Sequence, residues 1–413
     1  MKTAFSFLFL ILFAFKINAQ EIKAYNFDVK IDVVSKQLHV KGAIDIDFKN
    51  SDSISLMLWK NSNIHSIISD QKHVSYHFDT ISPSPIMYIP NGGKLIIYKQ
   101  RKSKEKQSII FDYDCDMHEL SGWAKSFSDN WIELNCYSAW FPLGSGNFTS
   151  KLRIWIDDKY KVTGSGIVKQ KNDHWEITQP WTGFDNVVIA SKNLKSRILH
   201  DGNSCIETNY SEFSEQEADS IISECRYLQN LYQNLLGKKD RVYLKFIMAP
   251  FSQGGGYSRK NFVSLRTKKF DLYTCGGIGH ELAHFWWSNA NTTTWEDWLN
   301  EAFAEYSMLI YFRERFGISV FDKKIEEYKK RSMNTPPIFG IDRNAPEAYV
   351  VLYEKGSLIL HELEQKIGKE QFIELLREVV NGKVKTTSNF LELVEKKISV
   401  DVRQWLENKI KTT

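Results

Sequence analysis

The chain lacks an excess of charge of one sign and, beyond its first residues, any long apolar run. Its 413 residues include 54 basic and 50 acidic side chains, for a net charge of +4, and no long basic stretch. This balance gives no reason to expect a nucleic-acid partner. No later segment approaches the roughly eighteen apolar residues that a membrane-spanning helix needs. We therefore expect no stable membrane insertion of the mature protein.

Only the first nineteen residues are strongly apolar. Lys2 precedes an apolar run from Ala4 to Phe15, and Lys16-Ile17-Asn18-Ala19 follows. This order predicts a cleavable secretory signal that ends at Ala19, with an uncleaved anchor as the alternative. No cysteine follows the predicted cut, so the sequence does not suggest a bacterial lipid anchor. We expect an exported protein, either periplasmic or secreted.

The remainder divides into two regions of different periodicity. Residues 20–200 contain short runs that alternate apolar and polar side chains, such as Val29–Val33 and Ala43–Phe48, separated by Asn, Asp, Ser and Gly clusters. Many short strands without intervening helices are typical of a sandwich or a folded-over sheet. Residues 201–413 instead favour helices at 211–236, 277–289 and 294–316 and from near residues 350, 369, 387 and 401, with strands at 241–247 and 261–265. The sequence thus predicts a signal peptide (1–19), an all-β domain (20–200) and a mostly helical domain (201–413).

The chemistry is concentrated in one pentapeptide, His280-Glu281-Leu282-Ala283-His284. Two histidines four residues apart lie on one face of a helix, so both imidazoles can bind one metal ion. Glu281 follows the first histidine and can take a proton from a metal-bound water. Zinc is the usual ion for two imidazoles and a carboxylate. The alternative is a helix that carries these three residues by chance.

A catalytic zinc needs a third protein ligand and an open position. The next predicted helix contains Asn300-Glu301-Ala302-Phe303-Ala304, which resembles the Asn-Glu-Gly-Phe-Ala segment of gluzincins. In that segment the glutamate is the third ligand, and the resemblance gives this role to Glu301. Glu305 lies one turn further on the same face and can accept the outer N–H of a ligating histidine. For Glu305 a solvated acidic residue is the alternative interpretation.

Three further segments extend the resemblance. His280–Trp286, Trp298–Glu301 and Tyr353-Glu354-Lys355-Gly356 occur in this order behind an all-β region. Together they resemble the aminopeptidase N family, whose catalytic domain has a thermolysin-like fold. The resemblance covers most of residues 20–413. It implies one zinc ion and a peptide substrate, and it implies that Tyr353 donates a hydrogen bond to the oxyanion of the tetrahedral intermediate.

The sequence departs from the family pattern at three places. Sixteen residues separate His284 from Glu301, two fewer than is usual, and the shortening falls in a link between helices that tolerates it. The family's Gly-x-Met-Glu-Asn segment, which anchors the substrate, is replaced by Gly254-Gly255-Gly256-Tyr257, without the glutamate that holds a free amino group. Little room remains before Thr413 for a large helical C-terminal domain, so we expect a more open cleft.

One amino-group anchor is retained by resemblance. Glu133 lies nine residues before Pro142, a spacing that matches the family's other anchor, which the β-domain contributes. We expect Gly254 to Tyr257 and the strand at 262–265 to form the edge of the cleft, where a substrate backbone could add as a strand. The expected function is therefore zinc-dependent peptide hydrolysis by an aminopeptidase.

Two alternatives remain at this point. The altered glycine-rich segment would also suit an endopeptidase or a peptidase for modified N-termini. A peptide-binding module that keeps the fold without activity is the second alternative, because a fold does not guarantee a reaction. The sequence predicts neither the oligomeric state nor the side chain preferred at the cut.

Export would permit disulfides among the five cysteines. Cys115–Cys136 and Cys205–Cys225 are the pairings closest in sequence, although connectivity does not follow from sequence. Cys275 lies five residues before His280 and could be a zinc ligand or a small buried residue. The second interpretation is favoured, because the histidine pair does not need it.

Overall fold

The structure is a computed structural model that describes residues 20–84, 86, 89–100, 104–120, 126–201, 204–238, 243–252 and 255–413. The predicted signal peptide and Gly254 lie outside the described residues. The chain forms two compact units: the first consists of Met1–Lys125, Asn135–Ile156 and Lys169–Phe184, the second of Ser126–Leu134, Asp157–Val168 and Asp185–Thr413. These units interleave along the sequence, whereas the predicted domains meet at one boundary after residue 200; that boundary stays a prediction.

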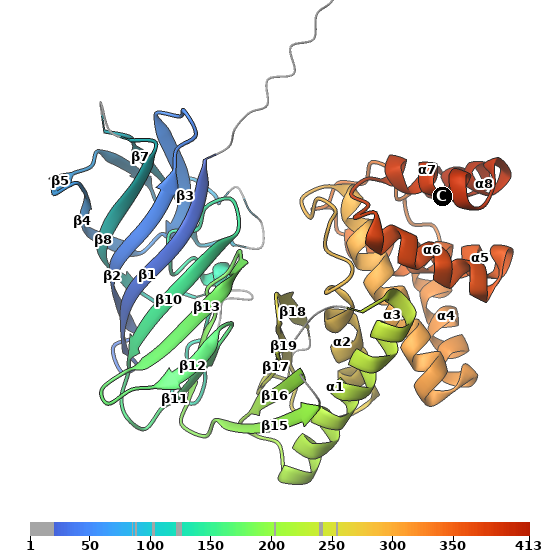
Figure 1. The fold of residues 1–413 in the computed structure, drawn as a ribbon, viewed down its shortest axis with the longest axis horizontal. Coiled ribbons are helices and arrows are strands. Elements are labelled where there is room, and N and C mark those ends of the chain that lie inside the picture. Colours follow the sequence, from blue (N-terminus) through green and yellow to red (C-terminus); the bar gives the residue numbers. More distant parts are fainter. Residues whose placement is uncertain are drawn as a thin grey trace, which may run out of the picture. The chain divides into compact units, whose positions relative to one another are not determined.

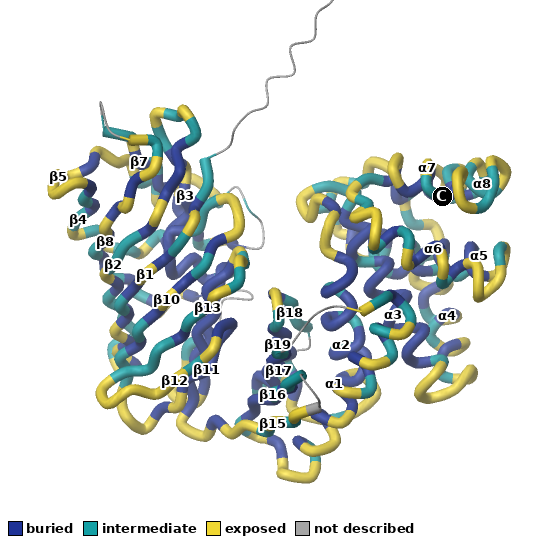
Figure 2. Tube along the Cα trace, in the orientation of Figure 1, coloured by how far each residue is buried: buried dark blue, intermediate teal, exposed yellow. Residues whose placement is uncertain are grey.

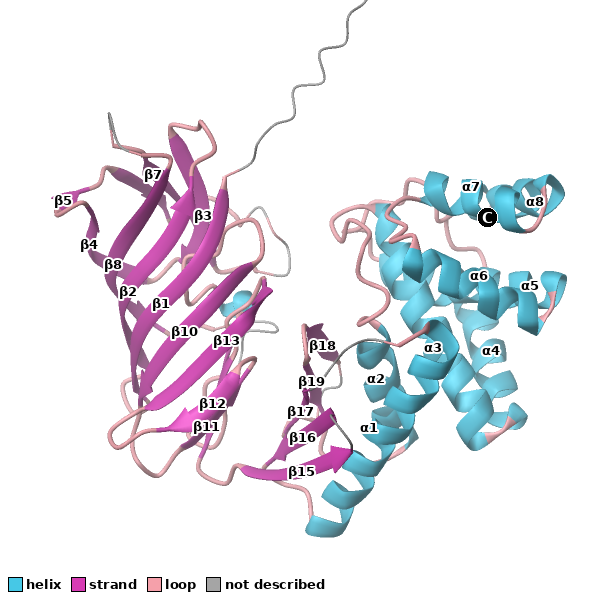
Figure 3. Ribbon diagram, in the orientation of Figure 1, coloured by secondary structure: helices cyan, strands magenta, loops and turns pink. Residues whose placement is uncertain are grey.

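The first unit is built from strands (Figures 1 and 3). They are β1 (Glu21–Asp32), β2 (Gln37–Asp47), β3 (Ser53–Trp59), β4 (Ser62–Ser69), β5 (Lys72–His73), β6 (Tyr76–Asp79), β7 (Gly92–Tyr98), β8 (Lys106–Asp116), β10 (Phe148–Trp155) and β13 (Trp175–Gly183), with β12 (Ile167–Gln170) crossing from the second unit. One sheet has the order β12-β13-β10-β1-β2-β8-β4-β5 and another the order β3-β7-β6.

Period-two alternation explains how these strands bury one face. In β8 the residues Gln107, Ile109, Phe111, Tyr113 and Cys115 are buried, while the residues between them are exposed or half-buried. The segment after the short helix η2 (Cys136–Ser138) covers the buried face. Carbonyls of this segment accept hydrogen bonds from buried tyrosines. Tyr25 OH donates to the Pro142 carbonyl at 2.6 Å, and Tyr113 OH donates to the Trp140 carbonyl at 3.1 Å.

The second unit joins two small sheets to a set of helices. Its strands are β9 (Ile132–Leu134), β11 (Lys161–Gly164), β14 (Val188–Ser191), β15 (Lys195–Asp201), β16 (Ser204–Tyr210), β17 (Tyr243–Ala249), β18 (Gly256–Arg259) and β19 (Phe262–Arg266). Its helices are α1 (Glu215–Leu236), α2 (Leu272–Ala283), η3 (Trp295–Asp297), α3 (Trp298–Phe316), α4 (Ile318–Ser332), η4 (Val350–Lys355), α5 (Gly356–Ile367), α6 (Lys369–Asn381), α7 (Thr387–Lys397) and α8 (Val400–Lys411). The sheet orders are β11-β14-β9 and β15-β16-β17-β19-β18, so β18 is an edge strand.

Caps explain where the first two helices begin. Ser214 and Glu217 form a capping box, so α1 begins at Glu215, four residues after the predicted start. Asp271 accepts a hydrogen bond from the backbone N–H of Thr274, so α2 begins at Leu272 rather than at Gly277. The expected end at Asn289 is also wrong, because α2 ends at Ala283. Gly256 and Tyr257, which the sequence places at the edge of the cleft, are the first two residues of β18.

One helix was not predicted. Gly317 ends α3, as expected, but α4 begins immediately after it and runs to Ser332. Its buried residues Phe321, Ile325 and Tyr328 have the four- and three-residue spacing of an amphipathic helix. The four predicted later helices are all present. A strand-rich region followed by a mostly helical one confirms the predicted fold class.

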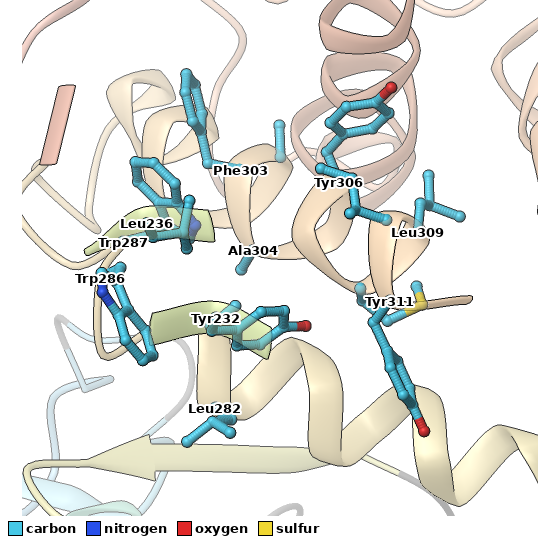
Figure 4. Packing of buried hydrophobic residues seen from close by; sticks show 14 of the residues in the cluster. Tyr232, Leu236, Leu282, Trp286, Trp287, Phe303, Ala304, Tyr306, Leu309 and Tyr311 are labelled. Atoms are coloured by element: carbon cyan, nitrogen blue, oxygen red, sulfur yellow. The ribbon is translucent and has the colours of Figure 1, made fainter. Parts of the chain in front are cut away.

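Helices α2 and α3 form the centre of the second unit. Almost the whole length of α3 is buried, and Figure 2 shows both helices mainly in the colour of buried residues. Figure 4 shows Leu282 of α2 near Tyr232 of α1 and near Trp286. The rings of Tyr232 and Trp286 are packed edge to face, with centroids 5.9 Å apart. Because every side of α3 is packed, its polar residues are held in fixed positions.

All five cysteines lie within the described residues, and all five carry free thiols. The two possible disulfides are therefore not formed in this structure. Cys275 is buried on α2 and is absent from the groups of described residues that could hold a metal ion. Among the described helices, none has the length and apolar character needed to cross a membrane.

A buried lysine makes the stability of the second unit dependent on pH. Lys245 of β17 is 2% exposed, and its ammonium donates to Thr163 Oγ1 at 3.2 Å and to the Gly166 carbonyl at 3.1 Å. Burial lowers the pKa of Lys245 to about 8 in the folded chain, although nearby Glu207 opposes the shift. Between pH 8 and about 10.4 the unfolded lysine therefore holds a proton that the folded one has lost, and stability rises with pH.

Lys245→Met is expected to remove this rise. Between pH 7.5 and 10.5 the unfolding free energy of the unmodified protein should increase by about 3 kcal/mol more than that of the variant. Urea unfolding over a pH series measures the difference. Lys159→Met, at a lysine whose side chain is 73% exposed, is the control and should follow the unmodified protein. Parallel pH curves for Lys245→Met and the unmodified protein would contradict the assignment.

Candidate metal centre

Helix α2 carries both histidines of the pentapeptide, and its small residues let it pack closely. A side chain at Gly279 would meet the Tyr311 ring at 3.2 Å and Tyr232 OH at 3.3 Å. Tyr232 OH also donates to the Gly279 carbonyl at 3.0 Å. Gly276 would meet Phe312 of α3 at 3.0 Å in the same way. The glycines therefore allow the close approach of α1 and α3 that fixes the axis of α2.

Three donor atoms from α2 and α3 form a nearly equilateral triangle. His280 Nε2 and His284 Nε2 lie 3.2 Å apart, and Glu301 Oε2 lies 3.3 Å from each. Ligand atoms at about 2.0–2.2 Å from a tetrahedral zinc are separated by roughly 3.3–3.6 Å. The three side chains are 13–16% exposed, so the triangle is nearly buried. The spacing and the donor types both fit one zinc ion.

The hydrogen bonds on the far side of each imidazole determine which nitrogen is free. His284 Nδ1 lies 3.0 Å from the Trp287 carbonyl, which can only accept, so Nδ1 carries the proton. His280 Nδ1 lies 2.6 Å from Glu305 Oε2, and Tyr328 OH donates to the other Glu305 oxygen. In the neutral form of each ring, Nε2 is then the nitrogen without a proton, and both Nε2 atoms lie 3.3 Å from Glu301 Oε2. This is the arrangement that a histidine needs in order to bind a metal through Nε2.

The charges in the triangle favour a cation. Glu301 Oε2 is buried and, among the described residues, has no hydrogen-bond partner of good geometry. Burial lowers the pKa of His280, but the nearby carboxylates of Glu301 and Glu305 outweigh this effect and raise the pKa well above its usual value, so positive charge is favoured at this place, from a proton or from a metal ion. Burial likewise opposes ionisation of Glu301, yet the two imidazoles hold its pKa far below the usual range. One carboxylate oxygen and two imidazole nitrogens around one position are a donor set that zinc binds, and the ion would displace the imidazole protons from Nε2.

Glu281 lies beside the triangle but is not part of it. It is 9% exposed, and burial raises the pKa of its carboxyl above the usual value. Gly256 of β18 lies against it, since a side chain there would meet Glu281 Cγ at 3.0 Å. Glycine at this position therefore leaves space for the Glu281 side chain, whose carboxylate interacts electrostatically with His280, His284 and Glu301.

Tyr353 lies on the π-helical segment η4, and its ring is stacked on that of His280. The ring centroids are 5.7 Å apart and the planes differ by 9°. Burial raises the pKa of Tyr353 well above its usual value, which keeps the phenol protonated as a donor. Arg343 Nη2 lies 3.4 Å from the phenol oxygen, and Arg343 Nε donates to Asp297 Oδ2 at 2.8 Å.

The sequence did not single out three residues around the site. Tyr328 contacts Glu305, while Arg343 and Asp297 support Tyr353. The spacing of Phe321, Ile325 and Tyr328 could have indicated α4. Arg343 lies between α4 and η4 in a segment without periodicity, and no pattern in the sequence indicates its contact with Tyr353.

The predicted substrate-binding residues fall into two groups. Glu133 of β9 is 2% exposed and accepts hydrogen bonds from Tyr257 OH at 2.5 Å, Ser264 Oγ at 3.2 Å and Trp131 Nε1 at 3.2 Å. Gly255 has φ of 118° and its carbonyl accepts from the Arg266 N–H, while Gly256 faces Glu281. The structure thus brings Glu133 to Tyr257. The role of Glu133 as an amine anchor stays a prediction, because its carboxylate already has three donors.

Residues 266–408 match the family described as "Peptidase family M1 domain". This span contains the three donors of the triangle together with Glu281 and Tyr353. The chain contains a peptidase family M1 domain. The predicted relationship to the aminopeptidase N family of gluzincins is confirmed, and zinc is the metal that this family implies.

Two aminopeptidases match about a quarter of the chain. Endoplasmic reticulum aminopeptidase 2 of Bos taurus is 36% identical over 113 residues, which are 24% of this chain and 12% of that protein. Probable aminopeptidase 1 of Saccharolobus solfataricus is 32% identical over 108 residues, which are 23% of this chain and 14% of that protein. The match thus spans about one eighth of the length of these relatives.

Solved structures show that the M1 similarity extends to the whole fold. An M1 zinc metallopeptidase from Deinococcus radiodurans has a TM-score of 0.71 and 16% identity, covering 95% of this chain and 94% of that chain. Native leukotriene A4 hydrolase from Saccharomyces cerevisiae has a TM-score of 0.71 and 14% identity, covering 95% and 68%. Both comparisons support the predicted arrangement of a β-rich region followed by a helical one.

Proposed function

We propose that this protein is a zinc-dependent metallopeptidase that binds one zinc ion and removes residues from the N-terminus of peptides. The observation that carries the proposal is the triangle of His280 Nε2, His284 Nε2 and Glu301 Oε2 with sides of 3.2–3.3 Å. The fit of these donors to zinc and the presence of Glu281 beside them point to hydrolysis. The names of the relatives, several of them aminopeptidases, support the N-terminal specificity.

Zinc, when bound by His280, His284 and Glu301, supplies a Lewis acid that polarises the scissile carbonyl and makes water a better nucleophile. Glu281 takes a proton from the attacking water and delivers it to the leaving amine. Tyr353 donates its phenolic hydrogen to the developing oxyanion. Glu305 and the Trp287 carbonyl hold the two imidazoles in the tautomers that leave Nε2 free.

The peptide is held at the edge strand β18. Among the described strands, β18 pairs with β19 alone, so its other side can accept an extended substrate backbone. Gly256 leaves the space beside Glu281 free of a side chain. A Deinococcus radiodurans M1 zinc metallopeptidase mutant of similar fold was crystallised with Tyr-Ser-Ala as substrate.

The same site would also suit cleavage within a peptide or at a modified N-terminus. Tyr257 occupies β18 where the family's anchoring glutamate is expected, and Glu133 is engaged by three donors. Without the family's glutamate on β18 and with Glu133 engaged, a free amino group of the substrate has no free carboxylate at either of the family's anchor positions. This alternative and the non-catalytic peptide-binding module give different results in the following experiment.

The experiment compares free and N-acetylated versions of the same peptide library, with cleavage sites mapped by mass spectrometry. An aminopeptidase should release single N-terminal residues from free peptides and leave acetylated ones intact. Dialysis against a chelator should abolish cleavage, and added Zn²⁺ should restore it. Equal cleavage of both libraries would favour the alternative specificity. Zinc-loaded protein without any cleavage would favour the binding module.

The apolar segment that ends at Ala19 supports a further proposal, that the protein is exported to a periplasm or beyond the cell. N-terminal sequencing of the protein from its producing cell should then find Gln20 as the first residue. A mature chain that begins at Met1 and stays in the cytosolic fraction would contradict export.

A further inference from the structure

A second group of described residues that could hold a metal ion lies in the first unit. One donor atom from each of His39, His65 and Asp112 lies within 4.8 Å of the others. The residues come from three neighbouring strands, because β8 lies between β2 and β4 in the large sheet. Nothing in the peptidase chemistry of the second unit uses them.

The register of the sheet brings these side chains to one face. His39 of β2 is opposite Asp114 of β8, and two residues further along Lys41 is opposite Asp112. On the other side of β8 the pairing with β4 shifts between Ile64 and Ser66, so His65 lies at a β-bulge. The central strand thus provides two carboxylates, and each flanking strand provides one imidazole.

Asp114 orients both imidazoles. Its Oδ1 lies 2.8 Å from His39 Nδ1, and its Oδ2 lies 2.7 Å from His65 Nε2. The second nitrogen of His39, Nε2, lies 3.8 Å from Asp112 Oδ1. His280 has the same arrangement as His39, since Glu305 contacts its Nδ1 and its Nε2 lies 3.3 Å from Glu301 Oε2. At His65 the carboxylate contacts Nε2 instead, which leaves Nδ1 for a metal. A carboxylate that fixes the outer nitrogen leaves the inner one free for a metal.

We propose that His39, His65 and Asp112 form a second binding site for a divalent transition-metal ion, with Asp114 as the carboxylate that orients the imidazoles. Two imidazoles and a carboxylate are the donor set of zinc and its neighbours, and Ca²⁺ and Mg²⁺ prefer oxygen ligands. The side chains of His39, His65 and Asp114 are about 40% exposed, so an ion can enter from solvent. The site is independent of the proposed peptidase function.

One neighbouring cation competes with the metal. Lys41 Nζ lies 2.8 Å from Asp112 Oδ2 and thereby offsets part of the negative charge of the site. Removing this charge without removing a ligand should tighten metal binding. Lys41→Gln should therefore strengthen metal binding, whereas removal of a ligand should weaken it. A variant that had lost its structure could not bind the metal more tightly.

The test is isothermal titration of Zn²⁺ into tag-free protein whose tightly bound zinc has been retained through dialysis. The unmodified protein should bind one additional equivalent per chain. His39→Asn and His65→Asn should each abolish it, Asp114→Asn should weaken it by about 10- to 100-fold, and Lys41→Gln should tighten it severalfold. His118→Asn is the matched control, because His118 is also an exposed histidine beside an aspartate, with Nδ1 2.6 Å from Asp116.

Circular dichroism and thermal unfolding establish that each variant is folded. No additional equivalent in the unmodified protein would overturn the proposal. So would an equivalent that survives both His39→Asn and His65→Asn, or one that His118→Asn removes. The result does not depend on hydrolysis, so failure of the peptidase proposal would leave this titration unaffected, and the reverse also holds.

Discussion

Glu281→Gln is expected to lower kcat for peptide hydrolysis by about 10³- to 10⁴-fold without loss of zinc. The amide has the shape of the carboxylate, so the packing against Gly256 is kept, but it cannot accept the proton of the attacking water. Glu281 is outside the triangle of donor atoms, and its loss should leave the metal site intact. Steady-state kinetics together with zinc analysis of the same preparation measure both effects.

The matched control for Glu281 is Glu362→Gln, at an exposed glutamate of α5 that pairs with Lys409. This variant should retain the kinetics of the unmodified protein. If Glu281→Gln retained hydrolysis within tenfold of the unmodified protein and full zinc content, another group would have to act as the base.

Tyr353→Phe is expected to lower kcat by about 10²- to 10³-fold with little change in KM or in zinc content, because the phenol is needed only when charge develops on the oxygen. The phenyl ring preserves the stacking on His280. Tyr349→Phe is a close control, since the ring of Tyr349 lies 4.5 Å from that of Tyr353 and is half exposed. Equal losses in both variants would show a structural effect of η4 rather than stabilisation of the oxyanion by Tyr353.

The centre of the site could be predicted because its residues lie within short sequence motifs. His280 and His284 are one helical turn apart, and Glu301 follows within a recognisable segment, so sequence spacing and three-dimensional spacing nearly coincide. The fold class could be predicted for a related reason. Period-two strands fill the first unit, and helical periodicity dominates the second.

The surroundings of the site could not be predicted, because they depend on packing between residues far apart in the sequence. Tyr328 reaches Glu305 only because α4 turns back directly after Gly317. Arg343 meets Tyr353 from a segment without periodicity. Glu133 is separated from Tyr257 by more than a hundred residues, and its hydrogen bonds depend on where β9 is placed against β18.

The second metal group shows the same limit for strands. His39, His65 and Asp112 are far apart in sequence, and only the register of β2, β8 and β4 brings them together. A shift of one residue in either pairing would turn an imidazole to the opposite face of the sheet. Alternation alone predicts the strands but not which of them are neighbours.

The central claim is that His280, His284 and Glu301 hold the zinc ion. Anomalous diffraction at the zinc absorption edge, from crystals of protein purified with its metal, tests it most directly. We predict a strong anomalous peak bounded by His280 Nε2, His284 Nε2 and Glu301 Oε2, and no such peak when His284 is replaced by alanine. Zinc-containing crystals of the unmodified protein without a peak among these three atoms would contradict the claim.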